Sequence, residues 1–258
     1  MRTRSARPLR PRLMGASMGI LIAASTAHAA SPAELFAQAN AAYEAGDYGQ
    51  AKTLYTQLQD RGYSSGWLSY DLGAAALRDG EVGEAVAHFR RAKAQLPRHG
   101  DVKANLAFAR SRTQDAIAPP EPAPWVHALC FWHYVLSYQE LVWTVMGLNI
   151  AFFSALGLLR FRPELEIGRW ASVLLGIGLV ATGTSFAIKT FWPTHLAVVT
   201  RPEITVHSGT HRDTVVRFKL HNGTEATVIG RDAGWYRIEL SDGKGGWVSE
   251  SDVTLVSL

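Results

Sequence analysis

The chain has 258 residues, of which 47% are hydrophobic and 19% are charged. Its formal net charge of +4 reflects 26 Lys and Arg against 22 Asp and Glu. Five basic residues and no acidic ones precede residue 30, so the rest of the chain carries −1 (21 against 22). This balance gives no support to a nucleic-acid-binding class. The single cysteine, Cys130, excludes an internal disulfide.

The first expected element is a signal peptide at residues 1–29. Arginines crowd the start, an apolar run extends from Leu13 to Ala27, and Ala27-His28-Ala29 ends the segment. A charged region, an apolar region and an A-x-A site in this order are typical of secretory signal peptides. We expect export with cleavage after Ala29, and an uncleaved anchor is the alternative.

A repeated pattern with a period of 34 residues follows. Gly46-Asp47-Tyr48, Ala51 and Tyr55 recur as Gly80-Glu81-Val82, Ala85 and Phe89. This period, with apolar residues at helical spacing, is typical of tetratricopeptide repeats. We expect two repeats of two helices each within residues 32–116, with Gly46 and Gly80 at the breaks. A capping helix then covers the last open face, with Asp101 as its N-cap.

The repeats resemble the tetratricopeptide family over about 80 residues. The resemblance implies a groove that binds proteins and is lined by the first helix of each repeat. For Trp67 and Tyr70, the core of a repeat is an equal alternative to the groove. Asp71 and Asp101 would repel a C-terminal carboxylate, which disfavours that kind of ligand. Mapped onto this sequence, the groove residues are Phe36, Asn40, Tyr43, Trp67, Tyr70 and Leu77.

A proline-rich stretch and an aromatic stretch come next. Residues 117–125 contain four prolines and are expected to form a semi-rigid spacer. Residues 126–138 are rich in aromatic side chains and are expected to form an interfacial helix at headgroup level. Cys130 and His133 lie in this stretch, and no orienting acid or amide is nearby in sequence. An aromatic belt is therefore favoured over a Cys–His catalytic pair.

Two runs of 19 residues, Leu141–Leu159 and Trp170–Ile188, contain no charged residue. Each is close to the roughly 20 residues that cross a hydrocarbon core of about 30 Å. We expect transmembrane helices at 139–160 and 170–190. Arg160, Arg162 and Arg169 flank or lie in the 161–169 loop, so the positive-inside rule places that loop in the cytoplasm and both flanking domains outside. The absence of ionisable residues in the two runs disfavours a transporter or an ion channel.

After Pro193 the pattern alternates between apolar and polar residues, and five or six short strands are expected. Asn222-Gly223 and Asp242-Gly243 indicate tight turns between them. The blocks Gly234-Trp235-Tyr236-Arg237-Ile238 and Gly246-Trp247-Val248 resemble those of bacterial SH3-like domains. The resemblance implies a small barrel at 195–258 that binds cell-wall peptides or packs on a neighbouring domain. Trp235 and Trp247 are its candidate binding surface, with sealing of the barrel as the alternative.

The fold class is therefore multi-domain: all-α tetratricopeptide repeats, two transmembrane helices and an all-β SH3-like barrel. This order of parts resembles that of BatE-type proteins of the Bat (Bacteroides aerotolerance) operons. The resemblance implies a non-catalytic scaffold in the bacterial inner membrane, linked to stress tolerance, with both domains periplasmic. Its implied partners are the lipid bilayer and proteins, including von Willebrand factor A-type membrane proteins of the same operon.

The alternative function is binding of peptidoglycan, or recruitment of an enzyme, through the SH3-like domain. The sequence contains no G-x-S-x-G, H-E-x-x-H or P-loop motif. Its histidines do not follow the spacing of a zinc site. We therefore expect no enzymatic activity, no cofactor, no metal and no nucleic-acid partner.

Overall fold

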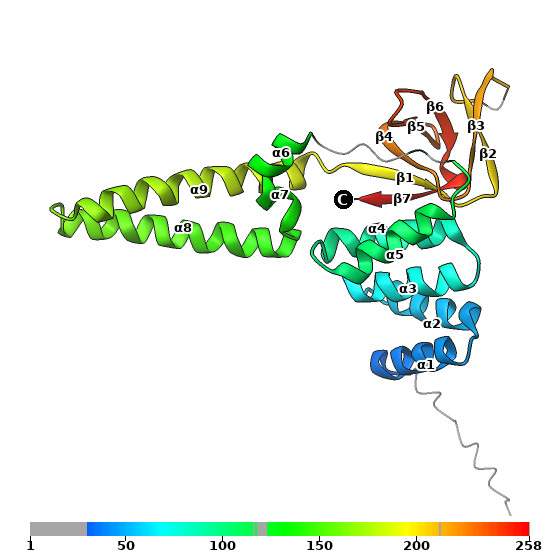
Figure 1. Ribbon diagram of the computed structural model, residues 1–258, viewed down its shortest axis with the longest axis horizontal. Coiled ribbons are helices and arrows are strands. Elements are labelled where there is room, and N and C mark those ends of the chain that lie inside the picture. Colours follow the sequence, from blue (N-terminus) through cyan, green and yellow to red (C-terminus); the bar gives the residue numbers. More distant parts are fainter. Residues whose placement is uncertain (1–29, 116, 118–122, 212, 258) are drawn as a thin grey trace, which may run out of the picture. The chain divides into compact units, whose positions relative to one another are not determined.

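The structure, a computed structural model, describes residues 30–115, 117, 123–211 and 213–257. The predicted signal peptide lies outside these residues, and so does most of the predicted proline spacer, at 118–122. The chain divides into two units, Met1–Ser31 and Pro32–Leu258, and the elements below all belong to the second. Figure 1 shows helices in the first part of this unit and strands in the last.

Two helical hairpins and a fifth helix form the N-terminal part of the described chain. Gly46 and Gly80 end the first helix of each hairpin in the left-handed conformation, with φ of 82° and 85°, which glycine adopts at no steric cost. Asp47 begins the second helix, because its carboxylate accepts a hydrogen bond of 3.1 Å from the backbone N–H of Gln50. The helices are α1 (Pro32–Glu44), α2 (Tyr48–Asp60), α3 (Gly66–Arg78), α4 (Val82–Gln95) and α5 (Gly100–Ser111).

The fifth helix starts two residues earlier than an N-cap at Asp101 would place it. Asp101 lies in the first turn of α5, and His99 occupies the N-cap position without a side-chain capping bond. The prediction of Asp101 as the N-cap is therefore wrong. Its carboxylate instead lies near the positive end of the helix dipole, where a negative charge is favourable.

Small residues allow the paired helices to approach closely. Ala39, Ala51 and Ala85 are completely buried. A Cβ atom on Gly73 of α3 would lie 2.8 Å from the ring of Phe89 on α4. Side-chain atoms do not approach that closely without displacement, so the contact between α3 and α4 depends on a glycine at this position.

The segment predicted as one interfacial helix forms two short helices, α6 (Pro124–Leu129) and α7 (Phe131–Val135). The break falls at Cys130, whose φ of −110° and ψ of 33° leave the helical region. The expectation of a single helix is therefore corrected. Ser137 then begins the next helix in a capping box with Glu140, in which each side chain bonds to the backbone N–H of the other residue.

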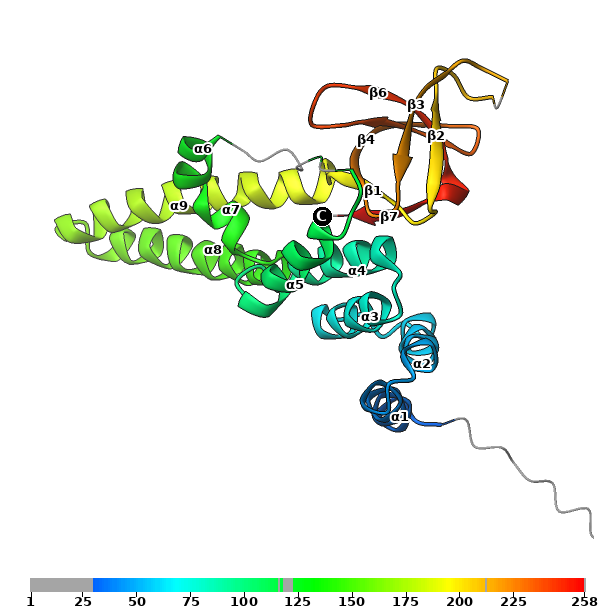
Figure 2. The ribbon, with the colours of Figure 1, turned by 45° about the vertical axis from the view of Figure 1, so that its right-hand side comes forward.

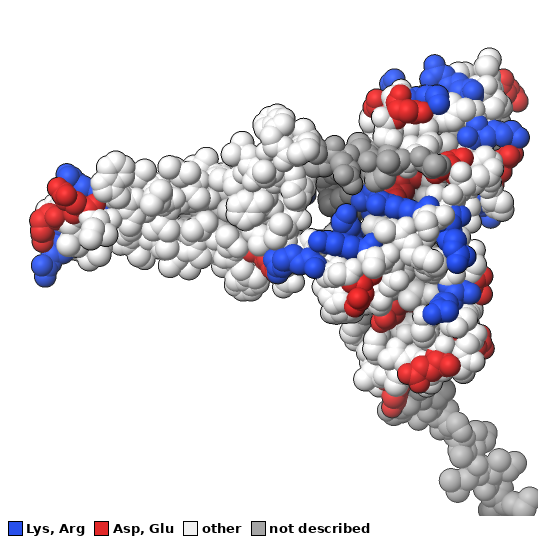
Figure 3. Space-filling model, in the orientation of Figure 1, with Lys and Arg blue, Asp and Glu red and all other residues white. Residues whose placement is uncertain are grey.

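Two long helices follow, α8 (Tyr138–Phe161) and α9 (Glu166–Phe191), which pack against each other and are long and apolar enough to cross a membrane. Large apolar side chains such as Ile150 and Leu174 are about two-thirds exposed. Figure 3 shows no charge along most of the length of this hairpin, with Lys, Arg, Asp and Glu gathered near its loop. Such a surface favours an apolar surrounding. Because α9 begins at Glu166, the connecting loop is shorter than the predicted 161–169.

The C-terminal part forms an antiparallel sheet with strand order β3-β2-β6-β5-β4-β1-β7. In β5 the side chains of Tyr236 and Ile238 are buried while Arg237 and Glu239 are exposed, which confirms the predicted alternation. The predicted turns hold Gly223 and Gly243 at positive φ. The strands are β1 (His195–Val199), β2 (Glu203–His207), β3 (Val216–His221), β4 (Glu225–Asp232), β5 (Trp235–Glu239), β6 (Gly245–Ser249) and, after a short 3₁₀ helix (Glu250–Asp252), β7 (Val253–Ser257).

Strand β7 was not predicted from the sequence, and it pairs with β1 in a register of five residues. Both strands are covered on both faces. One face of β1, with Ala197 and Val199, belongs to the core of the sheet. The other face, with Leu196 and Val198, joins a cluster of helical residues that includes Phe89. A strand that is covered on both faces has a continuous run of apolar residues in its sequence, and β1 has such a run.

The helices and the sheet therefore share a core. Val256 of β7 packs in the same cluster as Val86 and Leu106 of α4 and α5, and Figure 2 shows α4 beside β1 and β7. The approach is close at the start of α4, where a Cβ atom on Gly83 would collide with the carbonyl oxygen of Val199. The two predicted domains form one packed body in this part of the chain.

Candidate functional site

The predicted groove residues contribute to an aromatic surface on α1, α3 and α5. Trp67 is 48% exposed and Phe36 is 36% exposed. Trp67 makes edge contacts with Tyr70 and with His99, at ring centroid distances of 6.1 and 4.6 Å. Phe108 of α5, which the sequence did not single out, is 47% exposed. We define the aromatic face as Phe36, Tyr43, Trp67, Tyr70 and Phe108.

The other predicted groove residues have partners within the helical region. The side-chain oxygen of Asn40 accepts a hydrogen bond of 2.6 Å from the hydroxyl of Tyr55. Leu77 packs against the shared core. Tyr70 also contacts this core, through the ring of Phe89, while its hydroxyl accepts a bond of 2.7 Å from the Asn105 amide. Tyr70 therefore packs against the core through its ring and bonds to α5 through its hydroxyl, and its role in a binding groove stays a prediction.

Asp71 gives the aromatic face a negative charge in a partly desolvated place. Burial raises the pKa of its carboxyl group to about 6. Burial also raises the pKa of the neighbouring Tyr55 and Tyr70 hydroxyls, and the negative charge of Asp71 adds to both shifts. Asp101 acts on Tyr70 in the same direction. The electrostatic potential at this face therefore favours a positively charged group.

The second predicted surface lies on the C-terminal sheet. The ring of Trp235 meets the ring of His207 edge-on at 5.5 Å. Trp247 lies opposite His207 on β2 and opposite Arg237 on β5. Both tryptophans are half-buried and share the side of the sheet that Arg237 occupies, away from Tyr236 and Ile238. Successive residues of a strand point to opposite faces, which places both rings outside the sheet core.

Buried ion pairs connect the helices to the sheet. Glu225, at the start of β4, receives hydrogen bonds from the guanidinium groups of Arg90 on α4 and Arg110 on α5. The Glu225 side chain is only 4% exposed. Two arginines around one carboxylate satisfy its lone pairs in a place from which water is excluded.

A second carboxylate, Asp115, anchors the segment that follows α5. It accepts bonds of 2.7 Å from the backbone N–H of His221 and 2.6 Å from the Thr224 hydroxyl. Burial alone would raise the pKa of Asp115, but these bonds outweigh it and hold the pKa below its ordinary value. The chain is thus held on the sheet immediately before the proline-rich segment.

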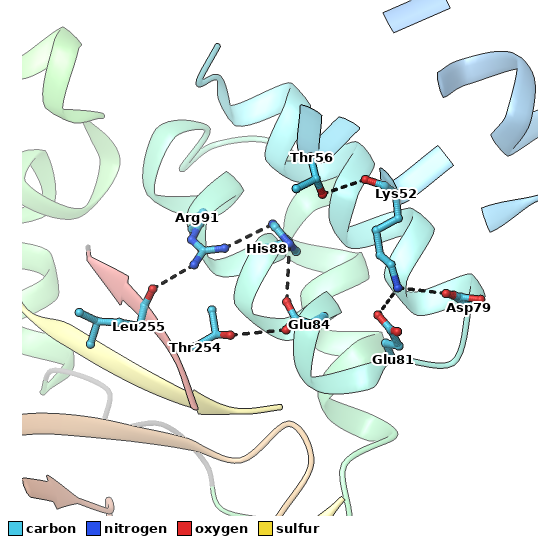
Figure 4. A network of polar contacts seen from close by, with 9 residues as sticks. All are labelled: Lys52, Thr56, Asp79, Glu81, Glu84, His88, Arg91, Thr254 and Leu255. Carbon is cyan, nitrogen blue, oxygen red and sulfur yellow. Dashed lines mark hydrogen bonds and ion pairs between the residues drawn. The ribbon is translucent and has the colours of Figure 1, made fainter. Parts of the chain in front are cut away.

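A polar cleft of about 880 Å³ lies between α2 and α4 on one side and the sheet on the other. Figure 4 shows its network of contacts. Lys52 of α2 bridges Asp79 and Glu81, and Arg91 of α4 donates a bond of 3.0 Å to the carbonyl oxygen of Leu255 on β7. Burial and the nearby charges of Arg91 and Lys52 lower the pKa of His88 to about 3. Arg91 and Glu84 bond to β7, while Lys52 joins α2 to the segment between α3 and α4, which indicates a structural role.

Cys130 lies between α6 and α7, and His133 lies on α7 among the described residues. Cys130 is a free, partly buried thiol, and no hydrogen bond between its side chain and His133 is present there. Burial, with the charge of Lys189, lowers the pKa of His133. No group of three or more His, Cys, Asp or Glu side chains that could hold a metal ion occurs in this part of the chain.

The comparisons with known proteins identify one part of the chain. Residues 215–254 match the family model of the bacterial SH3 domain. This stretch covers β3 to the start of β7 and contains both Trp235 and Trp247. No curated protein and no solved structure matches the chain. The C-terminal sheet therefore contains a bacterial SH3 domain at residues 215–254, and a domain of this kind suggests binding of proteins or peptidoglycan.

Sequence reasoning missed the ion pairs of Glu225 and the aromatic ring of Phe108. From the sequence, Glu225 after a turn and Arg90 and Arg110 on helices are expected to be exposed to solvent. The sequence pattern does not show which helix will cover the sheet. Phe108 had a usable signal, since it lies seven residues after Asp101 and therefore on the same side of α5.

Proposed function

We propose that this protein is a non-catalytic adaptor, anchored in the bacterial inner membrane, whose aromatic face binds a segment of a partner protein. The observation that carries the proposal is the exposed ring of Trp67 against Tyr70, a residue on which the negative charge of the half-buried Asp71 acts. Exposed aromatic rings are typical of binding hot spots. A desolvated carboxylate reduces stability at neutral pH, which suggests that it is retained for binding.

The partner segment fits best if it is apolar and carries a Lys or Arg. Such a side chain would lay its apolar stem on the rings and place its charge near Asp71, in an environment of low dielectric. We further propose that the helical hairpins are tetratricopeptide repeats. The 34-residue period, the left-handed glycines between helices and the close contact at Gly73 support this assignment.

The membrane arrangement is also a proposal. It is supported by two apolar helices and by arginines at their connecting loop, which would lie in the cytoplasm. The helical region and the SH3 domain would then both be periplasmic. The order of the parts supports a place in a Bat-type complex linked to stress tolerance, with von Willebrand factor A-type membrane proteins as the binding partners.

Point variants test the adaptor role better than a deletion of the helices, because a deletion would expose the shared core on β1 and β7. We expect the double variant Trp67→Ala and Phe108→Ala to reduce cross-linking to the partner at least about tenfold, since hot-spot residues contribute about 2 kcal/mol or more each. Quantitative mass spectrometry of cross-linked membranes measures this effect. Tyr63→Ala, which removes an equally exposed ring from the α2–α3 turn, is the matched control. Equal cross-linking by the wild-type protein, the double variant and Tyr63→Ala would contradict the proposal.

Asp71→Asn separates stability from binding. Because the pKa of Asp71 is higher in the folded chain than its ordinary value of 3.8, the folded state loses stability as pH rises through about 6. Removing the charge should therefore stabilise the protein at pH 7, by about 1 to 2 kcal/mol after allowance for solvent screening. The same variant should bind the partner more weakly. Denaturation in urea and partner cross-linking give the two readouts, and a variant that is less stable at pH 7 would refute this reading.

A second candidate function is peptidoglycan binding through the SH3 domain. The family match and the placement of Trp235 and Trp247 outside the sheet core favour it. Sedimentation of the full chain, in detergent, with purified sacculi tests it. We expect Trp247→Ala to abolish co-sedimentation and Ile229→Ala, at another exposed apolar position of the sheet, to preserve it. Absence of co-sedimentation by the wild-type chain would eliminate this candidate.

A further inference from the structure

One polar side chain lies in the middle of the uncharged surface that the hairpin of α8 and α9 presents in Figure 3. Asn149 is at the centre of the 24 residues of α8, and its side chain is exposed. Its amide makes no hydrogen bond with any residue that the structure describes. A helix of this length crosses a bilayer with its centre near the midplane. Once α8 spans a membrane, this unpaired amide therefore lies deep in the hydrocarbon core.

Hydroxyl side chains of the hairpin can be satisfied by their own helix. Thr182 and Thr184 of α9 donate bonds of 2.7 and 2.8 Å to backbone carbonyl oxygens four residues earlier. The exposed Ser154 of α8 can turn its hydroxyl in the same way. An amide differs because it also carries an acceptor, and the N–H groups inside a helix are already bonded. Asn149 therefore needs a hydrogen-bonding partner outside the hairpin, since hydrocarbon offers none.

Apolar side chains continue the surface of α8 on which Asn149 lies. Met146, Phe153 and Leu156 are each about half exposed, and Val142 is partly exposed. Successive members of this set are alternately four and three residues apart, which places them on one side of the helix. This is the heptad spacing with which the side chains of one helix pack between those of a second. We define the membrane stripe as Val142, Met146, Asn149, Phe153 and Leu156.

The chemistry of Asn149 selects a second copy of this chain as the partner of the stripe. The amide is complementary in charge to itself, because the partly positive N–H of one copy meets the partly negative carbonyl oxygen of the other. Copies with the same membrane topology present α8 in the same direction. A twofold axis along the membrane normal then brings the same residue of both copies together at the same depth. A single Asn in a heptad stripe also fixes the register and the number of helices.

We propose that the membrane stripe joins two copies of this chain in a parallel dimer, with their Asn149 amides hydrogen-bonded to each other near the bilayer midplane. The dimer carries two aromatic faces and two SH3 domains on the same side of the membrane. A partner with two binding segments would be held more tightly by such a pair than by one copy. The inference rests on the membrane anchoring proposed above.

Energy transfer between labelled copies in phosphatidylcholine liposomes tests the inference. Full-length protein with a donor or an acceptor fluorophore on a C-terminal tag is reconstituted at several protein-to-lipid ratios, which gives the dissociation constant of the dimer. We expect Asn149→Leu to weaken dimerisation roughly threefold to thirtyfold, the range for one or two interhelical hydrogen bonds. Asn149→Gln keeps the amide and should dimerise more tightly than Asn149→Leu. Ser154→Leu removes an exposed hydroxyl from another side of α8 and, as the matched control, should dimerise like the wild type.

Disulfide cross-linking in membranes identifies the surface that the two copies share. The variants are made in a Cys130→Ser background, which removes the native thiol. Phe153→Cys, on the stripe, should form a disulfide-linked dimer when the membranes are oxidised. Val180→Cys, at an exposed position near the middle of α9, is the matched control and should stay monomeric. Equal cross-linking of these two variants would contradict the stripe as the interface.

Other outcomes would overturn the inference in different ways. A monomeric wild-type protein, or equal dimerisation by the wild type and Asn149→Leu, would refute the dimer. A photo-reactive label on the Phe153→Cys variant reports on other occupants, and capture of a different membrane protein instead of a second copy would refute the second-copy assignment. Extraction of membranes with alkaline carbonate reports on insertion separately. A chain that resists extraction but stays monomeric would leave the anchoring proposal standing, whereas release by carbonate would overturn both.

Discussion

Glu225 links the helical region to the sheet through two arginines from different helices. Its side chain is almost completely buried, and Arg90 is nearly as inaccessible. A buried ion pair often adds little stability compared with apolar residues of the same shape. Removal of one partner, however, leaves an uncompensated charge in a place of low dielectric, so the consequence of a single substitution is large.

We therefore expect Glu225→Ala to lower the free energy of unfolding by about 3 to 5 kcal/mol. Glu239→Ala, at an exposed position of the neighbouring strand β5, should change it by less than about 0.5 kcal/mol. Urea denaturation of the two variants in the same detergent measures the difference. If both variants unfold at the same urea concentration, the Glu225 ion pairs do not hold the junction together.

His88 makes stability depend on pH in a defined direction. Its pKa is about 3 in the folded chain against an ordinary 6.5, so the unfolded chain takes up a proton that the folded chain excludes. The free energy of unfolding should therefore fall as pH falls from 6.5 towards 3, by up to about 1.4 kcal/mol per pH unit. Asp71 acts in the opposite direction between 3.8 and about 6. Because Asp71 is present in both proteins, comparison with His88→Gln isolates the histidine.

Melting temperatures at pH 7 and pH 5 provide the measurement. The wild-type protein should lose more stability between these values than His88→Gln does. The same loss in both proteins would show that His88 is not protected from protonation in the folded state.

At the scale of elements, the two repeats differ in what their second helix contacts. Gly49 of α2 and Gly83 of α4 occupy the same position in the 34-residue period. A Cβ atom on Gly49 would meet only the Asp79 carboxylate at 3.9 Å, whereas one on Gly83 would collide with the sheet at Val199 and Asn222. Gly49 is therefore a matched control for Gly83, because it occupies the same repeat position without contact with the sheet.

We expect Gly49→Ala to stabilise the protein by about 0.5 to 1 kcal/mol, because alanine restricts the unfolded chain and favours a helix. Gly83→Ala should instead destabilise it by about 1 to 3 kcal/mol, since the sheet must move away from α4. Chemical denaturation measures both changes. A stabilising effect at both positions would mean that the sheet does not rest on the start of α4.

At the scale of the whole molecule, the shared core predicts that the helical region and the SH3 domain unfold together. Leu196, Val198 and Val256 would lose their helical neighbours if the sheet separated. Hydrogen exchange followed by mass spectrometry should therefore show peptides from 66–111 and from 195–257 losing protection at the same denaturant concentration. Loss of protection at two well-separated concentrations would contradict a single cooperative unit.

Much of this architecture could be predicted because its signals are local. Gly46 and Gly80 indicate where helices end, the uncharged runs after Leu141 and Trp170 indicate long apolar helices, and Asp242-Gly243 indicates a turn. Two of the failures are the N-cap of α5, where a misleading local signal was followed, and strand β7, whose pairing partner is distant in the sequence. Asp101 resembles an N-cap, yet α5 begins at Gly100. Strand β7 was missed because its pairing with β1 joins residues about sixty positions apart.

Local patterns in the sequence predict most elements of this protein, their order and the apolar character of α8 and α9, because periodicity and turn residues act over a few positions. The packing of distant segments places β1 and β7 between two cores, joins Glu225 to two helices, and brings cations from α4, α5 and α9 to one cavity. These features depend on which surfaces meet. Contacts between distant segments are chosen by complementary shape and charge, which no local pattern records.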